Sequence, residues 1–255
     1  MLNAFIANFQ KSWIEFKRYY FNTISGLATV LIFFYLIFFG IKAIGGSTMD
    51  FGNTLEGVIV GYFMWLMFIF SFQGVAWGII DEAQRGTLEQ VFVSPIAFEY
   101  QMLFRMISDF VFNVLFAVPL MYFVSYTTGK QLNFDLPTLL YLLVIGTVSA
   151  LGIGMMLGGI ALVFKRISSF IQIITFGSLA FTMFDLSKLW YRFLPMSQAA
   201  YLMRKLAING TKFYQFHFLD HVILWSVAAI YLAAGILVFR GFEKRAMITG
   251  TLGQY

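Results

Sequence analysis

Six long apolar stretches constrain the fold of this chain more than any other feature. They cover approximately residues 24–40, 57–80, 107–126, 136–164, 170–184 and 219–239. A helix needs about 20 predominantly apolar residues to cross the hydrocarbon core of a bilayer, and only the fifth stretch is clearly short. The runs are apolar on all sides rather than alternating, which favours helices over the strands of a membrane barrel. We therefore expect an all-α integral membrane protein with six transmembrane helices.

The composition agrees with a membrane protein. Hydrophobic residues make up 60% of the 255 residues and charged residues 11%, whereas soluble domains carry about 25% charged residues. Cysteine is absent, which excludes disulfides and thiolate metal sites. The net charge of +5 arises from bases that flank the apolar runs, a pattern of membrane flanks rather than of nucleic-acid binding. No linker or repeat divides the chain, so we expect a single transmembrane domain over residues 1–255.

Residues 1–22 predict an amphipathic helix that lies at the membrane surface. Phe9, Trp13 and Phe16 recur at helical spacing, while Lys17 and Arg18 occupy other faces. A cleavable signal peptide is the rival interpretation. It is disfavoured because the polar region is long and the apolar run that follows exceeds the usual length.

The distribution of bases predicts that both termini are cytoplasmic. The expected cytoplasmic flanks contain Lys11, Lys17, Arg18, Arg85, Arg105, Lys165, Arg166, Arg240, Lys244 and Arg245. The first two outer loops contain only Lys42 and Lys130, as the positive-inside rule requires. Residues 185–218 run against this trend, because they are expected outside and yet contain several bases, so the orientation depends on the other loops.

The connection after the second apolar stretch, within residues 81–105, predicts two short cytoplasmic helices. Gly86 interrupts the first helical run, Thr87 can cap the next, and Ser94 with Pro95 supplies a further cap. Leu88, Val91 and Phe92 form one apolar face. The acids Asp81, Glu82 and Glu89 surround this face. Such a helix can dock into a groove of a soluble partner, or it can pack on its own membrane domain.

The order Glu82-x-x-Arg85-Gly86-Thr87-Leu88-Glu89, followed by Ser94-Pro95, resembles the signature of type-2 ABC transporter permeases. The likeness extends across the chain and is greatest to the drug-resistance, antibiotic-export and nodulation-factor branch. In that family this segment is the coupling helix that contacts the ATP-binding subunit. The resemblance therefore implies a coupling role for Glu82, Arg85, Gly86, Thr87, Leu88, Glu89, Val91, Phe92, Ser94 and Pro95.

A second segment is similar to the same family. The run Leu194-Pro195-Met196-Ser197-Gln198, with Tyr201 and Arg204 after it, resembles the part that precedes the last span. The resemblance implies that residues 185–218 form a partly re-entrant outer segment, with Pro195, Tyr201 and Arg204 as its characteristic residues. We expect its bases to snorkel toward the membrane interface. An ordinary extracellular loop is the alternative.

The fourth apolar stretch carries a stripe of small residues. Gly146, Ala150, Gly154 and Gly158 recur at four-residue spacing, which lets helices approach closely. A moving interface of a transporter and tight static packing explain this stripe equally well.

Polar residues within the apolar stretches are few. Gln73 and Gln172 are candidates for lining a transport pathway, because amides are costly in lipid and face protein or water. Hydrogen bonding between helices is the more common reason for such residues. Asn113, with Asp109 near a membrane end, belongs to the same small group.

The chain lacks the motifs of an enzyme or an ATPase. No phosphate-binding loop of the Gly-x-x-x-x-Gly-Lys-Ser/Thr type occurs, so ATP and Mg²⁺ are expected on a partner subunit and no cofactor on this chain. His217 and His221 have the spacing of two metal ligands, but without further ligands we expect no metal site. No catalytic constellation stands out, so the chain is interpreted as non-enzymatic.

The resemblance implies a complex in the cell membrane, in which this chain pairs with a second identical or similar permease and with two ATP-binding subunits. Its implied cargo is an amphipathic drug, peptide antibiotic, lipid or glycolipid that is moved outward. A polysaccharide or O-antigen-type exporter is the nearest alternative. An ATP-independent channel or carrier and a membrane-embedded lipid-modifying enzyme are more distant ones. Membrane lipid is an expected partner, and nucleic acid is not.

Overall fold

A computed structural model describes residues 6, 9–10, 13–14, 16–43, 55–86, 90, 98–164, 167–183 and 189–249. Within these residues the chain is helical and has no strand, which confirms the all-α prediction. The helices are α2 (Tyr20–Ala43), α3 (Leu55–Gln84), α5 (Phe98–Thr128), α6 (Leu136–Phe164), α7 (Ser168–Met183), η1 (Leu189–Phe193), α8 (Ser197–Asn209), η2 (Phe213–Gln215) and α9 (Phe218–Thr249).

Five helices in the described part of the chain are long and apolar enough to cross a membrane. Their candidate spans are Tyr20–Ala43, Leu55–Glu82, Phe104–Thr128, Leu136–Phe164 and Phe218–Ile248. The remaining expected span, residues 170–184, corresponds to α7, which has 16 residues. At 1.5 Å per residue α7 is about 24 Å long, less than the hydrocarbon thickness of about 30 Å.

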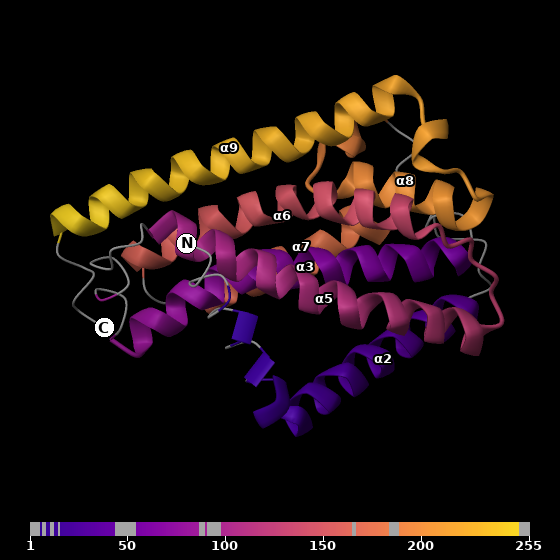
Figure 1. Ribbon diagram of the computed structural model, residues 1–255, viewed down its shortest axis with the longest axis horizontal. Helices are drawn as coiled ribbons and strands as arrows, with labels where there is room; N and C mark the ends of the chain where they lie inside the picture. The colour runs from indigo at the N-terminus through magenta and orange to yellow at the C-terminus, as the bar shows by residue number, and fades with distance from the viewer. Residues whose placement is uncertain are drawn as a thin grey trace.

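The helices run along one common direction, with α3 and α6 at the centre (Figure 1). α3 is buried on all sides from residue 57 to residue 69, because α2, α5, α6, α7 and α8 all contact it. α9 lies along α6, and α2 diverges from the bundle toward its own N-terminal end (Figure 1). The C-terminal end of α9 lies away from α8, which occupies the opposite end of the bundle (Figure 1).

Glycines bring α6 and α9 into direct backbone contact. A Cβ atom on Gly152 would lie 2.2 Å from the carbonyl oxygen of Tyr231, and one on Gly235 would lie 2.4 Å from the carbonyl oxygen of Gly152. A Cβ on Gly159 would lie 2.9 Å from Cα of Phe239. Only glycine fits at such a crossing, so the helix pair depends on these positions.

The stripe at four-residue spacing faces different neighbours. A Cβ on Gly154 would lie 2.7 Å from the carbonyl oxygen of Phe72 on α3, and one on Gly146 would lie 2.6 Å from Cβ of Ala199 on α8. Gly158 faces Ile79 of α3, and Ala150 is fully buried. α6 therefore packs against α3 and α8 with one face and against α9 with another.

Asp135 caps the N-terminus of α6 outside the membrane-spanning segment. One of its carboxylate oxygens accepts hydrogen bonds from the backbone N–H of Thr138, at 3.2 Å, and from the Thr138 hydroxyl. The Lys212 ammonium lies 3.7 Å from the other oxygen. The Thr138 hydroxyl, the backbone N–H and Lys212 together hold the pKa of Asp135 below its ordinary 3.8, although partial desolvation opposes the shift.

The cap predicts a pH-dependent stability difference between wild type and Asp135→Asn. A lowered carboxyl pKa stabilises the native state above the ordinary value, and this contribution is lost as the pH falls through the native pKa. We expect Asp135→Asn to melt slightly below wild type at pH 7, with the gap shrinking as the pH drops below about 4. Thermal melts of the detergent-solubilised chain between pH 7 and pH 3 measure it, and a gap that does not change with pH would contradict the assignment.

Candidate functional site

A polar cleft lies between α3, α5 and the N-terminal part of α2, near the end of the bundle where α3 ends and α5 begins. On α5, Arg105, Asp109 and Asn113 are four residues apart and therefore share one face. The cleft has a volume of 720 Å³. Its walls include Phe16, Tyr19, Asn22, Thr23, Phe70, Gln73, Gly74, Trp77, Asp81, Arg85, Arg105, Asp109, Phe112, Asn113 and Phe116.

Among the described residues that line the cleft are two acids and two bases. Arg85 forms a two-point ion pair with Asp81, at 2.9 Å and 3.0 Å. Arg105 Nε lies 3.9 Å from Asp109 Oδ2, which is an ion-pair distance longer than a hydrogen bond. The two ion pairs therefore differ. Arg85 contacts both carboxylate oxygens of Asp81 at hydrogen-bond distance, whereas Arg105 and Asp109 interact at ion-pair distance only.

Glycines of α3 provide the space for the charged side chains of α5. A Cβ on Gly78 would lie 2.9 Å from Cζ of Arg105, and one on Gly74 would lie 3.5 Å from Oδ2 of Asp109. The guanidinium of Arg105 therefore rests directly on the backbone of α3. This contact sets where its positive charge stands along the cleft.

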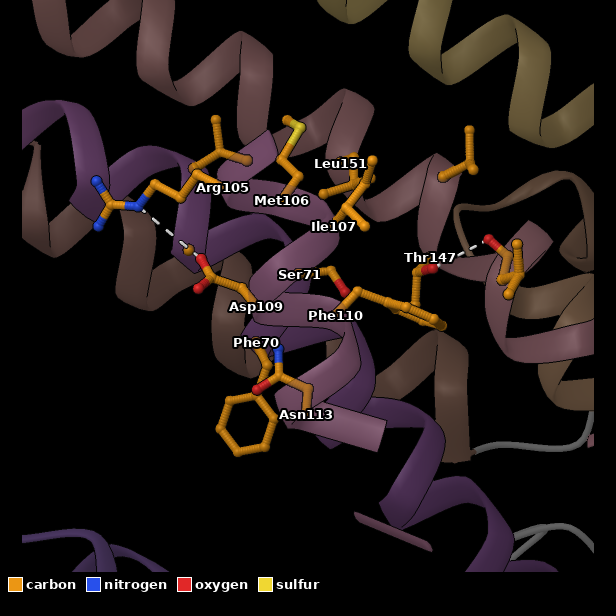
Figure 2. A pocket seen from close by; sticks show the side chains of 14 residues that line it. Phe70, Ser71, Arg105, Met106, Ile107, Asp109, Phe110, Asn113, Thr147 and Leu151 are labelled. Atoms are coloured by element: carbon orange, nitrogen blue, oxygen red, sulfur yellow. Dashed lines mark hydrogen bonds and ion pairs between the residues drawn. The ribbon is translucent and has the colours of Figure 1, made fainter. Parts of the chain in front are cut away.

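An apolar pocket adjoins the polar cleft on the side of α6. It has a volume of 360 Å³, within the range of about 300–1,000 Å³ of small-molecule sites. Figure 2 shows its walls, with Arg105, Asp109 and Asn113 along α5 and with Met106, Ile107 and Leu151 on another side. The pocket shares Phe70, Gly74, Arg105, Asp109 and Asn113 with the cleft. Arg105, Asp109 and Asn113 of α5 thus lie at the boundary between the polar cleft and the apolar pocket.

The two glutamines named as pathway candidates lie in different surroundings. The Gln73 amide donates a 2.8 Å hydrogen bond to the Thr175 hydroxyl, which joins α3 to α7, and its side chain also lines the polar cleft. Gln172 is exposed on α7 and does not line the cleft or the apolar pocket. Gln73 therefore forms an interhelical hydrogen bond and also lines the cleft, so its assignment to a pathway stays a prediction.

The N-terminal segment packs its aromatic residues on α5, beside the polar cleft. The ring centroids of Phe9 and Phe112 are 5.1 Å apart, and those of Phe16 and Phe116 are 5.2 Å apart. Trp13 also stacks on Phe112, at 6.2 Å. The described residues from 6 to 18 are helical. The face that was expected to lie in the membrane surface therefore contacts a neighbouring helix.

Part of the expected coupling segment follows α3 directly. Glu82 lies in the last turns of α3, and Gly86 has a φ of +70° just after the helix ends, a conformation that glycine adopts readily. Arg85 is held by Asp81. The other residues assigned to coupling lie outside the described part of the chain, namely Thr87, Leu88, Glu89, Val91, Phe92, Ser94 and Pro95.

A buried charge cluster holds the segment before α9 at the opposite end of the bundle. Asp220, in the first turn of α9, has 7% of its side chain exposed and lies 3.2 Å from Lys205 Nζ and 3.6 Å from Arg192 Nη1. The Gln198 amide donates to the backbone oxygen and the carboxylate of Asp220. The Tyr201 ring stacks on the Arg192 guanidinium at 3.7 Å. This charge cluster joins η1, α8 and α9.

Pro195 and Arg204, the other two residues expected to characterise this segment, are buried. Pro195 precedes Met196, whose φ of 62° starts α8. Arg204 donates a 2.7 Å hydrogen bond to the carbonyl oxygen of Thr182, and its guanidinium rests on Gly61 of α3. Arg204 is 7% exposed, so the expectation that the bases of this segment snorkel is wrong for this residue. The missing side chain of Gly61 makes room for the buried guanidinium.

The histidine pair forms no metal site among the described residues, where no group of three or more His, Asp or Glu ligands comes together. His221 Nδ1 lies 2.8 Å from the Tyr141 hydroxyl, and its Nε2 lies 3.0 Å from the carbonyl oxygen of Phe213. The carbonyl requires a proton on Nε2. In the neutral ring Tyr141 then donates to Nδ1, and Trp225 donates to Tyr141 at 3.2 Å.

Two groupings were not anticipated from the sequence. The first is the alignment of Arg105 with Asp109 and Asn113 on one face of α5, which their four-residue spacing could have indicated. The second is the ion-pair set of Asp220 with Lys205 and Arg192. No local pattern indicates this second set, because its members come from three separate elements.

Long apolar helices around a buried α3 define a multi-pass membrane protein. A family model described as ABC-2 family transporter protein matches residues 47–237, about three quarters of the chain. The chain therefore belongs to the ABC-2 transporter family, which confirms the predicted resemblance to type-2 ABC permeases. It is a membrane transport subunit, and the family implies an ATP-binding partner subunit and oligomerisation. A comparison with curated proteins gives no match.

Proposed function

We propose that this chain is the membrane-spanning subunit of an ATP-driven exporter that moves an amphipathic compound outward. The observation that supports this proposal most is the polar cleft beside the apolar pocket, which share the stripe of Arg105, Asp109 and Asn113. An amphipathic molecule has one part suited to each space. A polysaccharide cargo is less well served, because the apolar pocket offers a sugar chain few hydrogen-bond partners.

In this proposal α7 is the sixth crossing and both termini are cytoplasmic. The cleft then opens in the cytoplasmic half, close to the segment after α3 that we assign to coupling. α8 and the charge cluster around Asp220 form the outer, partly re-entrant segment. ATP and Mg²⁺ are held by two copies of the partner subunit, and a second permease completes the membrane domain. Closure of the ATP-binding subunits would act through residues 82–95 and shift the packing of α3 and α5.

Affinity capture tests this proposal. The tagged chain is isolated from membranes in mild detergent, and co-purified protein is identified by mass spectrometry and assayed for ATPase activity. We expect an ATP-binding subunit in the wild-type sample. Glu82→Ala and Glu89→Ala should each lower its recovery, roughly tenfold if a charge-assisted contact is lost.

The matched control is Glu56→Ala, which removes a carboxylate that pairs with Lys130 at 2.9 Å at the opposite end of α3. Its recovery of the ATP-binding subunit should equal that of wild type. Repeated capture without any ATPase would favour a channel, a carrier or a lipid-modifying enzyme instead.

A further inference from the structure

The apolar pocket separates α5 from α6 over the surface of α3. α5 and α6 each pack along α3, whereas the described parts of these two helices hardly contact each other. Side chains from all three helices surround the pocket, which has a volume of 360 Å³. Figure 2 shows among them Ile107 and Phe110 of α5 and Thr147 and Leu151 of α6. α3 therefore forms the floor of the pocket, and α5 and α6 form two of its walls.

The pocket is open at the outer surface of the bundle. Ile107 of α5 and Val144 of α6 line it and are nevertheless 42% and 48% exposed. Both residues lie inside candidate membrane spans, Phe104–Thr128 and Leu136–Phe164. The medium at this opening is therefore the hydrocarbon of the bilayer. A chain of a membrane lipid can reach the pocket from the side, between α5 and α6.

The polar groups that line the pocket are engaged within the protein. The hydroxyls of Ser71 and Thr147 each donate a 2.7 Å hydrogen bond to the carbonyl oxygen four residues earlier in their own helix. Arg105 and Asp109 lie 3.9 Å apart and form an ion pair with each other. Most of the other lining side chains are apolar. Apolar cavities stay dry, whereas hydrocarbon fills them well, so the walls suit an apolar occupant.

The depth of the pocket matches an acyl chain of one leaflet. Arg105 lies at the start of the candidate span Phe104–Thr128. Asn113 is the residue of α5 that lines the pocket farthest from it, about 12 Å further along the helix. Half of the hydrocarbon core of a bilayer measures about 15 Å. The pocket thus runs from the edge of the membrane core to near its middle, along the path of a lipid chain.

We propose that the apolar pocket holds one acyl chain of a phospholipid from the leaflet at the Arg105 end of the bundle. Without an occupant the walls would lack van der Waals contacts across this space, and the adjoining bilayer supplies a chain that restores them. The headgroup stays at the membrane interface and needs no partner in the polar cleft. The inference goes beyond the proposed function, because lipid binding requires neither a cargo nor an ATP-binding subunit. A cargo that uses the pocket would have to displace this chain.

Photolabelling of the full chain in lipid nanodiscs tests the inference. The probe is a phosphatidylcholine with a diazirine midway along one acyl chain, and adducts are assigned to single residues by mass spectrometry. We expect adducts on Phe110 and Leu151 inside the pocket. We also expect them on Val111, which follows Phe110, is 43% exposed and does not line the pocket. Val111 reports lipid on the outer surface of the same helix at the same depth.

Val148→Trp distinguishes the pocket from the outer surface. The indole fills the pocket, so adducts on Phe110 and Leu151 should fall at least about tenfold, whereas those on Val111 should change less than about twofold. The matched control is Leu237→Trp, which adds the same side chain at a position of α9 that is 71% exposed. This variant should label like wild type. After exchange into detergent, wild type should retain about one phospholipid per chain, and Val148→Trp should retain none.

The inference is overturned if wild type is labelled on Val111 but not on Phe110 and Leu151. A second copy of the chain seated over the opening would give this result. Equal losses on Phe110 and Val111 in Val148→Trp would overturn it as well. Should Val148→Trp fail to fold, the lipid retained by wild type decides, and its complete loss in detergent refutes the site. None of these readouts requires an ATPase, so failure of the exporter proposal would leave this inference standing.

Discussion

Gly152→Ala is expected to destabilise the folded chain more than any other single methyl addition considered. The new Cβ would lie 2.2 Å from the carbonyl oxygen of Tyr231 and 2.8 Å from the backbone nitrogen of Leu232. Ordinary contact begins near 3.4 Å, and the obstructing atoms are backbone, so α6 and α9 would have to separate. Overpacking costs typically about 1–3 kcal/mol, and we expect the upper end of that range or more.

The matched control for this prediction is Gly177→Ala on α7. Nothing lies within 4 Å of a Cβ at that position, and alanine favours a helix over glycine by up to about 1 kcal/mol. Unfolding in mixed micelles with rising SDS fraction compares the two variants with wild type. Equal curves for Gly152→Ala and Gly177→Ala would show that the close crossing of α6 and α9 is not where this structure places it.

The second large effect is expected for Asp220→Asn. This change leaves the amide contact with Gln198 available but removes the negative charge between Lys205 and Arg192. Those bases have 28% and 15% of their side chains exposed, so Lys205 would be left partly buried without this carboxylate, and Arg192 would lose its contact with it. Breaking a fully buried pair costs about 3–5 kcal/mol, and partial exposure of Lys205 lowers the expected loss to about 2–3 kcal/mol.

Two further variants check this interpretation of Asp220. Adding Lys205→Gln to Asp220→Asn should recover part of the lost stability, because one unpaired charge is removed as well. Glu56→Gln breaks the more exposed pair with Lys130, whose side chain is 32% exposed, and should cost less than about 1 kcal/mol. The same unfolding assay measures all of them. A loss for Asp220→Asn no greater than that for Glu56→Gln would argue against a structural role of the charge cluster.

The sequence by itself determined the class of structure and the family. Apolar runs of membrane length required helices, and the described chain is all-helical with five candidate spans. These properties are local, because hydropathy and helical period can be read within a single segment. The motif around Arg85 likewise indicated an ABC-2 permease, and the family match over residues 47–237 confirms it. The length of an apolar run was least decisive for α7, because its 16 residues are fewer than a membrane-spanning helix usually needs.

Only the tertiary structure decided which remote groups meet. Small residues on α6 indicated close packing, but not that Gly152 crosses α9 while Gly154 faces α3. Arg204 belongs to a segment whose bases were expected to reach the interface, yet it is buried against Gly61. Arg105 looked like one more cytoplasmic flank until Gly78 and the apolar pocket were seen beside it. The reason is physical: partners between helices depend on helix neighbours and rotation, which the period of one helix does not contain.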